Sequence, residues 1–409
     1  MSTKNAWQIS IAISVIFVAI LSGLWWQMAR YDNSDSLYDT DCHKRCAGIP
    51  LQDCNCIEQS AQLKDQATVT RYLKKVMAED AIAPLKKIPT GLFIQSLKFY
   101  NSSEVSLTGY LWQRYDYSES NALRLEEGEI GFIFPEQVNS GSDITPIEVY
   151  REKTAQGELI GWYFEVTVRQ PFDYSKYPFD HKTVWLRIWP KDFTKNIVLT
   201  PHLASYKGTG IKDRFAYEKA IVLGSWSHQD TYFNYKLATY DTNFGFLQNL
   251  GDTRNDIVGW DKQFPELHMN IVVKRKFENA FVVYLLPLFL ITALLFGATL
   301  TISSEKKTKD SLGFNAFGFI GATSGLFFVL MLAHIQLRQE FEGTSIVYIE
   351  YFYIFMYIFL VLVTANAYLF SIRYKGGKNW IVYRNNLLPK LLFWPIFTCV
   401  LVIITYWIM

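Results

Sequence analysis

Apolar residues gather into five long runs, and polar residues dominate the stretch between the first run and the other four. The first run extends from Trp7 to Trp26. The later four cover about residues 280–302, 314–337, 346–372 and 388–409. Each run approaches or exceeds the roughly 20 residues that a helix needs to cross a bilayer. We therefore expect a membrane protein with one large water-facing region, at about residues 30–275.

The water-facing region changes its pattern near residue 90. Residues 53–83 contain many helix formers, which predicts one or two helices, and Pro84 and Pro89 mark a boundary. Beyond it, short runs rich in aromatic and β-branched residues are separated by Asn, Gly, Ser and Asp. The predicted strands include Leu92–Phe99, Val105–Tyr115, Leu159–Val168, Thr183–Trp189, Tyr217–Leu223 and Leu267–Lys274. Short strands at this spacing predict a β-sandwich.

These patterns divide the chain into four parts and make it an α+β membrane protein. The parts are a transmembrane anchor or signal segment (1–28), a small Cys-containing helical segment (29–87), a β-domain (88–276) and a four-helix transmembrane domain (277–409).

The loop charges predict an orientation. The segment Ser303–Asp310 and the segment before the last run are short and basic, so both are expected in the cytoplasm. The β-domain then lies on the periplasmic or extracellular side of the cytoplasmic (inner) membrane, and Lys4 agrees with this. The net charge is only +2, which gives no electrostatic reason to expect a nucleic-acid partner.

The N-terminal part leaves two questions open. The first run is either a cleaved signal peptide or a retained anchor; Trp25 and Trp26 stand where a cleavage region would be, and this favours the anchor. Four of the five cysteines then follow within fifteen residues: Cys42, Cys46, Cys54 and Cys56. In an exported segment they predict two disulfides, with three possible pairings. A metal site with His43 is the alternative, but the Cys-x-x-Cys spacing of common zinc modules is missing. We expect no metal or cofactor.

One loop carries the most specific motif. Residues 169–180 read Arg-Gln-Pro-Phe-Asp-Tyr-Ser-Lys-Tyr-Pro-Phe-Asp. Pro178 fixes φ and biases Tyr177 away from helix, Phe179 offers an apolar anchor, and Asp180 adds a charge. Further on, Arg275 precedes the second apolar run, and Pro287 follows twelve residues later.

Together with Gly91–Phe99 and Leu107–Tyr115, these motifs resemble the pentameric ligand-gated ion channels, the Cys-loop receptor superfamily. The resemblance covers about residues 88–409. The family's loop disulfide has no counterpart, because Gln170 and Val184 stand at its positions, as in divergent prokaryotic members.

The resemblance implies a fold, a function and a set of coupling residues. The fold is an extracytoplasmic immunoglobulin-like β-sandwich followed by a four-helix channel domain, and the function is gating of a pore by a small molecule or protons. The partners are the lipid bilayer, copies of the same chain in a pentamer, and inorganic ions. The coupling residues are Tyr177, Pro178, Phe179, Asp180, Arg275 and Pro287, with an Asp180–Arg275 ion pair between the domains. Alternatively, the basic residues only anchor the span at the interface.

The candidate pore helix covers about residues 312–340. At 100° per residue, one face gathers the expected pore residues Phe319, Thr323, Phe327, Leu330 and His334. The apolar ones would form a gate that closes by dewetting, and His334, as an ionisable residue within a span, is a functional candidate. The alternatives are a hydrogen-bonded His at the helix end and an apolar face toward lipid. Cation selectivity is favoured, although the segment from Pro287 to Phe341 is longer than in the family and Phe341 stands where the family has a proline.

In the family, the ligand binds in an aromatic box between subunits. The candidates here are Trp112, Tyr115, Trp189, Tyr232, Tyr235 and Trp260, with 240–264 as a capping loop. Aromatic cages suit cations, but β-sandwich cores use the same residues. A non-conducting membrane sensor on the same scaffold is the main alternative function. An envelope hydrolase is disfavoured, because neither G-x-S-x-G nor H-E-x-x-H occurs.

Overall fold

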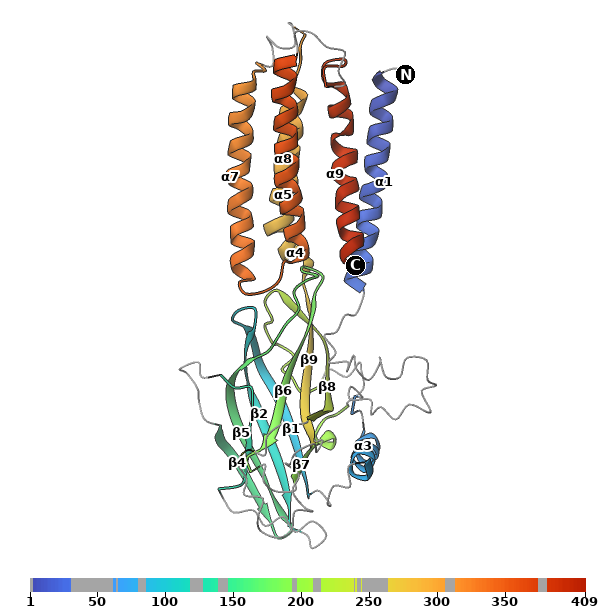
Figure 1. Ribbon diagram of the computed structural model, residues 1–409. Helices are drawn as coiled ribbons and strands as arrows, with labels where there is room; N and C mark the ends of the chain where they lie inside the picture. Colours follow the sequence, from blue (N-terminus) through green and yellow to red (C-terminus); the bar gives the residue numbers. More distant parts are fainter. Residues whose placement is uncertain are drawn as a thin grey trace. The chain divides into compact units, whose positions relative to one another are not determined.

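The computed structural model shows two compact units, whose elements Figure 1 labels. The helical unit consists of Met1–Asp32, Asp173–Asp180 and Arg275–Met409, and the β unit of Asn33–Phe172 and His181–Lys274. The structure describes residues 3–30, 62–63, 65–79, 86–117, 128–138, 146–192, 197–208, 215–238, 240, 244, 264–305, 313–373 and 381–409.

The β unit contains one described helix and two sheets. The helix is α3 (Gln66–Glu79). The five-stranded sheet has the order β4 (Ile147–Thr154), β5 (Gly157–Arg169), β2 (Glu104–Asp116), β1 (Lys86–Phe99), β7 (Ile197–Pro201). The four-stranded sheet has the order β3 (Phe132–Ile133), β6 (His181–Pro190), β9 (Phe264–Arg275), β8 (Trp226–Ala238). A short 3-10 turn, Leu203–Ser205, follows β7.

The strands pair mostly antiparallel, and alternation of side chains builds one core. Strand β2 pairs antiparallel with both β1 and β5, whereas β1 and β7 run parallel. Buried apolar residues from both sheets belong to a single cluster, for example Ile94 and Leu107 from one sheet and Leu186 and Met269 from the other. Helix α3 adds apolar side chains to this cluster, and its Tyr72 stacks on Tyr235 at 5.2 Å between ring centroids.

The predicted strands agree with the structure except at one place. Five of the six segments lie in β1, β2, β5, β6 and β9. The strand predicted at Tyr217–Leu223 was wrong: Tyr217 makes only an isolated bridge to Ile94. A backbone hydrogen bond of 3.1 Å from Ile221 N to Glu218 O closes a turn there, which interrupts the extended backbone.

The helical unit contains α1 (Thr3–Arg30), α4 (Phe277–Ala280), α5 (Leu286–Leu300), α7 (Ala316–Glu340), α8 (Tyr348–Arg373) and α9 (Leu387–Ile408). A π-helical turn, Phe281–Leu285, joins α4 to α5. Pro287 stands in the first turn of α5, where its missing N–H is tolerated. Helix α7 packs against α8 and α5, and α9 packs against α8, α5 and α1 (Figure 1).

The helices are suited to a membrane by length and composition. Five helical stretches qualify as spans: Thr3–Arg30, Phe277–Leu300, Ala316–Glu340, Tyr348–Ile372 and Leu387–Ile408. Many of their large apolar side chains are exposed, among them Phe317, Leu332 and Ile403. Exposed apolar surface of this extent is typical of contact with lipid rather than water. These helices indicate a membrane protein.

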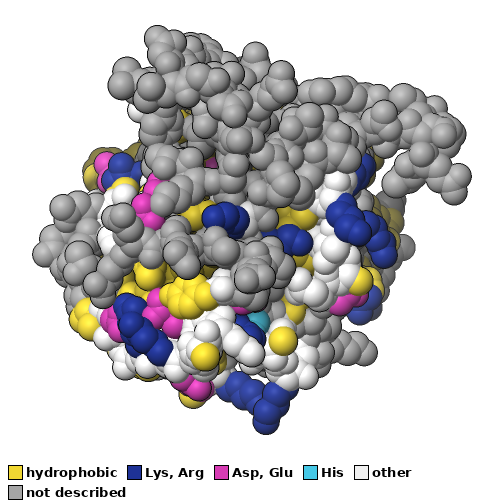
Figure 2. Space-filling view, turned by 90° about the horizontal axis from the view of Figure 1, so that it is seen from below, with side chains coloured by type: hydrophobic (Ala, Val, Ile, Leu, Met, Phe, Trp, Pro, Cys, Tyr) yellow, Lys and Arg dark blue, Asp and Glu magenta, His cyan; other side chains and the backbone are white. Residues whose placement is uncertain are grey.

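The face shown in Figure 2 carries charges of both signs. Lys and Arg side chains lie among Asp and Glu side chains on its described part, with hydrophobic side chains between them.

Candidate functional site

The loop Asp173–Asp180 belongs to the helical unit although β5 and β6 flank it in sequence. It is shaped by local hydrogen bonds. Ser175 N donates to Asp173 Oδ1 at 2.8 Å, Tyr177 N to Tyr174 O at 2.9 Å, and Phe179 N to Lys176 O at 2.8 Å. The Tyr177–Pro178 peptide bond is cis. The result is a compact turn that presents Tyr177, Phe179 and Asp180 to the helices.

Asp180 and Arg275 form a buried, two-atom ion pair. Arg275 Nε donates to Asp180 Oδ1 at 2.8 Å, and Nη2 donates to Oδ2 at 3.3 Å. Both residues are buried, and Arg275 N also donates to Asp180 O at 3.2 Å. The guanidinium carbon lies 4.6 Å from the centroid of the Tyr177 ring, a cation–π contact. Burial opposes the charge of Arg275, but the Asp180 carboxylate outweighs burial and raises the pKa of Arg275.

Tyr177 connects this pair to the end of α7. Its ring centroid lies 4.5 Å from that of Phe341, the residue that caps α7, and 6.1 Å from that of Tyr284. Tyr284 belongs to the π-helical turn, and its hydroxyl donates to the carboxylate of Glu340, the last residue of α7. The loop therefore touches the end of α7 and the π-helical turn before α5 through aromatic rings.

Phe179 occupies a second aromatic position. Its ring stacks on Phe277, the first residue of α4, with centroids 5.1 Å apart. The ring of Tyr348, at the start of α8, lies 6.2 Å away, and Tyr348 N donates to Ser175 O at 2.9 Å. The predicted coupling residues other than Pro287 thus come together. Pro287 instead stands in the first turn of α5.

The structure turns much of the predicted pore face toward the interior of the helical unit. Phe319, Thr323 and Leu330 are buried, and Thr323 Oγ1 donates to the carbonyl of Phe319 at 3.1 Å. Phe327 is exposed over 38% of its surface, although its ring contacts Tyr357 of α8 at 5.7 Å. The opposite face of α7 is the open one within a single subunit, and it includes Gly321, Phe328 and Leu332.

His334 faces α8. Its Nδ1 lies 3.3 Å from Tyr357 Oη, and its Nε2 lies 3.6 Å from Oε1 of the buried Glu350. Arg338 Nη1 lies 3.3 Å from Oε2 of the same carboxylate. A cavity of about 300 Å³ borders these three side chains and is otherwise lined by isoleucines.

In the β unit, the ligand candidate Trp189 has acidic, basic and aromatic neighbours. Its Nε1 donates to Glu266 Oε1 at 2.8 Å, and its ring meets Tyr240 edge-on at 5.7 Å and Phe244 at 6.4 Å. Arg187 donates to Glu266 Oε2 at 3.0 Å and also pairs with Glu136. When all three are ionised, two carboxylates face one guanidinium and one negative charge is uncompensated.

The pKa values around Trp189 follow from burial and from this pairing. Burial raises the pKa of Glu136. Burial also works against the charge of Glu266, but the neighbouring His268, the Tyr240 hydroxyl and the Arg187 charge together prevail, and the pKa of Glu266 is lowered. Burial lowers the pKa of His268, whose Nε2 lies 3.9 Å from Glu266 Oε2.

The other aromatic candidates make hydrogen bonds to different residues. Tyr235 is buried and its hydroxyl donates to Leu199 O at 2.8 Å. Trp112 Nε1 lies 3.2 Å from His202 Nδ1. Tyr232 lies on β8, where its carbonyl accepts from the side chain of Asn270.

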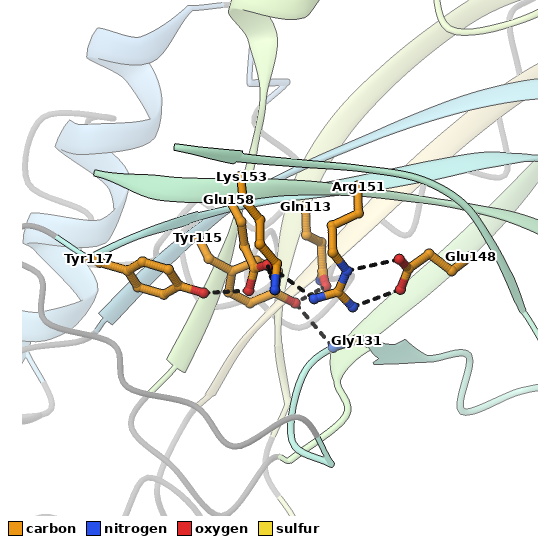
Figure 3. Close-up of polar contacts among 8 residues, drawn as sticks. All are labelled: Gln113, Tyr115, Tyr117, Gly131, Glu148, Arg151, Lys153 and Glu158. Atoms are coloured by element: carbon orange, nitrogen blue, oxygen red, sulfur yellow. Dashed lines mark hydrogen bonds and ion pairs between the residues drawn. The ribbon is translucent and has the colours of Figure 1, made fainter. Parts of the chain in front are cut away.

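Tyr115 belongs to a polar group beside the edge strand β4 (Figure 3). Its hydroxyl donates to Gln113 Oε1 at 2.6 Å and accepts from Gly131 N at 3.1 Å. Nearby, Glu158 accepts from Tyr117 and, at 3.0 Å, from Arg151. Tyr115 therefore has a core position with a satisfied hydroxyl, and charged side chains on β4 protect this sheet edge from further pairing.

Some predicted residues lie outside the described part of the chain. They are Trp260 and the four clustered cysteines Cys42, Cys46, Cys54 and Cys56. Conversely, Phe277, Tyr284 and Tyr348 contact the aromatic residues of the loop, although their side chains were not among the predicted site residues. Their only signal was an aromatic residue near the start of an apolar run.

Neither a protein-family model nor a curated protein matches this chain. The function is therefore inferred from the residues and their geometry.

Proposed function

We propose that this protein is a subunit of a homopentameric, ligand- or proton-gated ion channel. In this proposal the β unit is an immunoglobulin-like sandwich outside the cytoplasmic membrane, and the spans from Phe277 onward form the four-helix channel domain. The two sheets with a shared core and the apolar helices support it, as do the motifs that resemble Cys-loop receptors.

The loop Asp173–Asp180 is the observation that carries the proposal. The chain leaves one β strand, forms this loop on the helices, and returns to the next strand. Its Asp180 is held by Arg275, the last residue of β9 before the first channel span. A shift of these strands would therefore move the loop, Phe341 and the end of α7 together. Such a joint transmits movement because packed aromatic rings and a buried ion pair deform little.

The geometry also favours a particular ligand class and pore face. Near Trp189 and Tyr240, two carboxylates, those of Glu136 and Glu266, accompany the one guanidinium of Arg187. This excess of acidic over basic groups, beside aromatic rings, suits a small cationic amine. In a pentamer with α7 at the axis, the open face with Gly321, Phe328 and Leu332 would line the pore. Large apolar residues on that face would close it by dewetting.

Current recording tests the proposal. Purified full-length protein in planar bilayers is stepped from pH 8 to pH 4 and then exposed to small amines. We expect evoked unitary currents whose half-maximal stimulus rises strongly in Asp180→Asn and Arg275→Gln, with Lys176→Gln, a change at a half-buried position of the same loop, as the control. Silence from a confirmed pentamer would contradict a proton- or amine-gated channel, and a monomeric protein would contradict the assembly.

A non-conducting membrane sensor is the second candidate. One observation favours it: along α7, residues 316–337 contain no Asp, Glu, Lys or Arg. A pore without charged rings over this length has weak electrostatic attraction for ions. A sensor would keep the pentamer and bind an amine, but would show no current under any of these conditions.

A further inference from the structure

Helix α1 brings an additional tryptophan to the coupling loop. Trp25 lies near the C-terminal end of α1 and is half-buried. Its ring centroid lies 6.0 Å from that of Phe179 in the loop and 5.8 Å from that of Phe277 at the start of α4. One side chain from outside the four channel helices therefore touches both partners of the Phe179–Phe277 stack.

Hydrogen bonds fix Trp25 in this position. Its Nε1 donates to Tyr348 Oη at 2.7 Å, and Tyr348 Oη lies 2.6 Å from Thr405 Oγ1 of α9. Thr405 Oγ1 donates in turn to Leu401 O at 2.7 Å. Tyr348 is buried, and its backbone N–H holds Ser175 of the loop. The network thus joins α1, α8 and α9, and Tyr348 links it to the loop.

A second contact, far from Trp25, shows that α1 has a defined place on α9. Ser10 Oγ donates to Leu391 O at 2.5 Å, and Ser10 is buried. Ser10 precedes Trp25 by fifteen residues, and Leu391 precedes Thr405 by fourteen. At about 1.5 Å per residue the two helices therefore run in the same direction with matched rise. Figure 1 shows α1 alongside α9. Polar contacts between spans at two levels are typical of specific helix packing in membranes.

The simpler explanation is that Trp25 only anchors a helix end at the membrane surface. Its neighbour Trp26 fits that role better. Trp26 is 59% exposed, and the Arg30 guanidinium carbon lies 3.5 Å from its ring centroid. Trp25 instead gives its N–H to a protein hydroxyl. The two adjacent tryptophans differ in surroundings, so Trp26 provides a matched control.

We propose that α1 remains in the mature protein as a fifth span, and that Trp25 is a positioning residue for the loop Asp173–Asp180. Trp25 holds Phe179 by ring contact and Tyr348 by a hydrogen bond, and these two residues hold the loop. The effect on gating rests on the proposed channel function; the effect on the loop does not. In a channel, α1 would set the ease with which the loop moves.

The first test uses the full-length protein in detergent. Its intact mass shows whether α1 is retained, and hydrogen exchange reports on the amides of Tyr177, Phe179 and Tyr348, which all donate hydrogen bonds. We expect Trp25→Ala to speed the exchange of these amides about tenfold. This corresponds to a loss of local stability equal to the contribution of roughly one hydrogen bond. Trp25→Phe keeps an aromatic ring and is expected to speed mainly the Tyr348 amide. Trp26→Ala leaves all three unchanged.

Several results would overturn the proposal: a mature mass that lacks residues 1–30, unchanged exchange in both Trp25 variants, or an equal effect of Trp26→Ala. If Trp25→Ala fails to fold, Trp25→Phe still decides the matter through the Tyr348 amide.

A second test separates this proposal from the channel function. Proton-evoked current is recorded from the same variants between pH 8 and pH 4. We expect Trp25→Ala to shift the half-maximal proton concentration severalfold while Trp26→Ala does not. An exchange effect without current in any variant, wild type included, would support the position of Trp25 and contradict a proton-gated channel. Current that is equal in all variants would overturn the gating role of Trp25 alone.

Discussion

Two arginines, Arg275 in the helical unit and Arg187 in the β unit, are each paired with carboxylates but in different ways. Arg275 is paired with the carboxylate of Asp180, which lies 95 positions away in the sequence. Arg187 has two partners, Glu136 and Glu266, and further polar neighbours in Trp189 and Tyr240. The Arg187 arrangement therefore contains two carboxylates, and either can neutralise the arginine when the other is removed.

This difference shows what each group is suited to do. A buried ion pair links the loop to the residue that precedes a span. The position of the loop therefore depends on the position of that span. An arginine with two carboxylate neighbours stays neutralised when one of them is removed. When both are ionised, the second carboxylate can also neutralise a bound cation. We therefore propose that Asp180–Arg275 acts as a mechanical joint and that the Arg187 group acts as a binding element.

The largest expected effect is the loss of the Asp180 charge beside Arg275. Asp180→Asn keeps the shape of the side chain but removes the carboxylate charge that faces a buried guanidinium, which costs about 3–5 kcal/mol in free energy of unfolding. Reversible denaturant unfolding of the full chain in detergent measures it. A loss below about 1 kcal/mol would show that the pair is solvated in solution.

The matched change in the β unit is expected to cost less. Glu266→Gln leaves Glu136 to neutralise Arg187, so we expect a loss of about 1–2 kcal/mol from weakened hydrogen bonds. Removing both carboxylates with Glu136→Gln and Glu266→Gln should cost as much as Asp180→Asn. If the single and double variants lose the same free energy, the second carboxylate is not a substitute for the first.

The aromatic side of the joint is expected to contribute less again. Tyr177→Leu removes the ring that faces both Arg275 and Phe341, and we expect a loss of about 1–2 kcal/mol from these contacts. Tyr177→Phe keeps the ring and serves as the control. Equal losses in the two variants would assign the effect to the hydroxyl instead.

The smallest effect is a pH dependence from His268. Burial lowers the pKa of His268 in the folded state, so the unfolded state takes up a proton first as the pH falls below about 6.5. Stability should therefore decrease from about pH 6.5 to pH 5, with a slope of at most about 1.4 kcal/mol per pH unit. The raised pKa of Glu136 has the opposite effect on stability as the pH falls. Since Glu136 is present in wild type and in the His268→Gln variant, a comparison of their pH profiles removes its contribution. Identical pH profiles of the two would contradict this prediction.

Much of the fold could be predicted from the sequence. The apolar runs marked the five long helices, and the alternation of aromatic and β-branched residues marked most strands. The strand at Tyr217–Leu223 failed because a local turn, set by backbone hydrogen bonds, overrides the propensity of its residues. The order of strands in the two sheets did not follow from any local pattern, since it depends on contacts between distant segments.

The candidate site was predictable where a motif carried it. The loop residues Tyr177, Phe179 and Asp180 stood out by the spacing of proline and aromatic residues. The orientation of α7 was not predictable, because a nearly uniform apolar helix has no polar face to indicate which side is covered. Trp25 and Tyr348 lie 323 positions apart, and only the folded structure brings them together.

A double-mutant cycle on evoked current tests the central claim most directly. The stimulus for half-maximal current is measured for wild type, Asp180→Asn, Arg275→Gln and the double variant, with surface pentamer confirmed for each. If Asp180 and Arg275 act as one joint, the double variant is no more impaired than either single variant. Effects that add independently, or half-maximal stimuli unchanged in all three variants, would contradict the account.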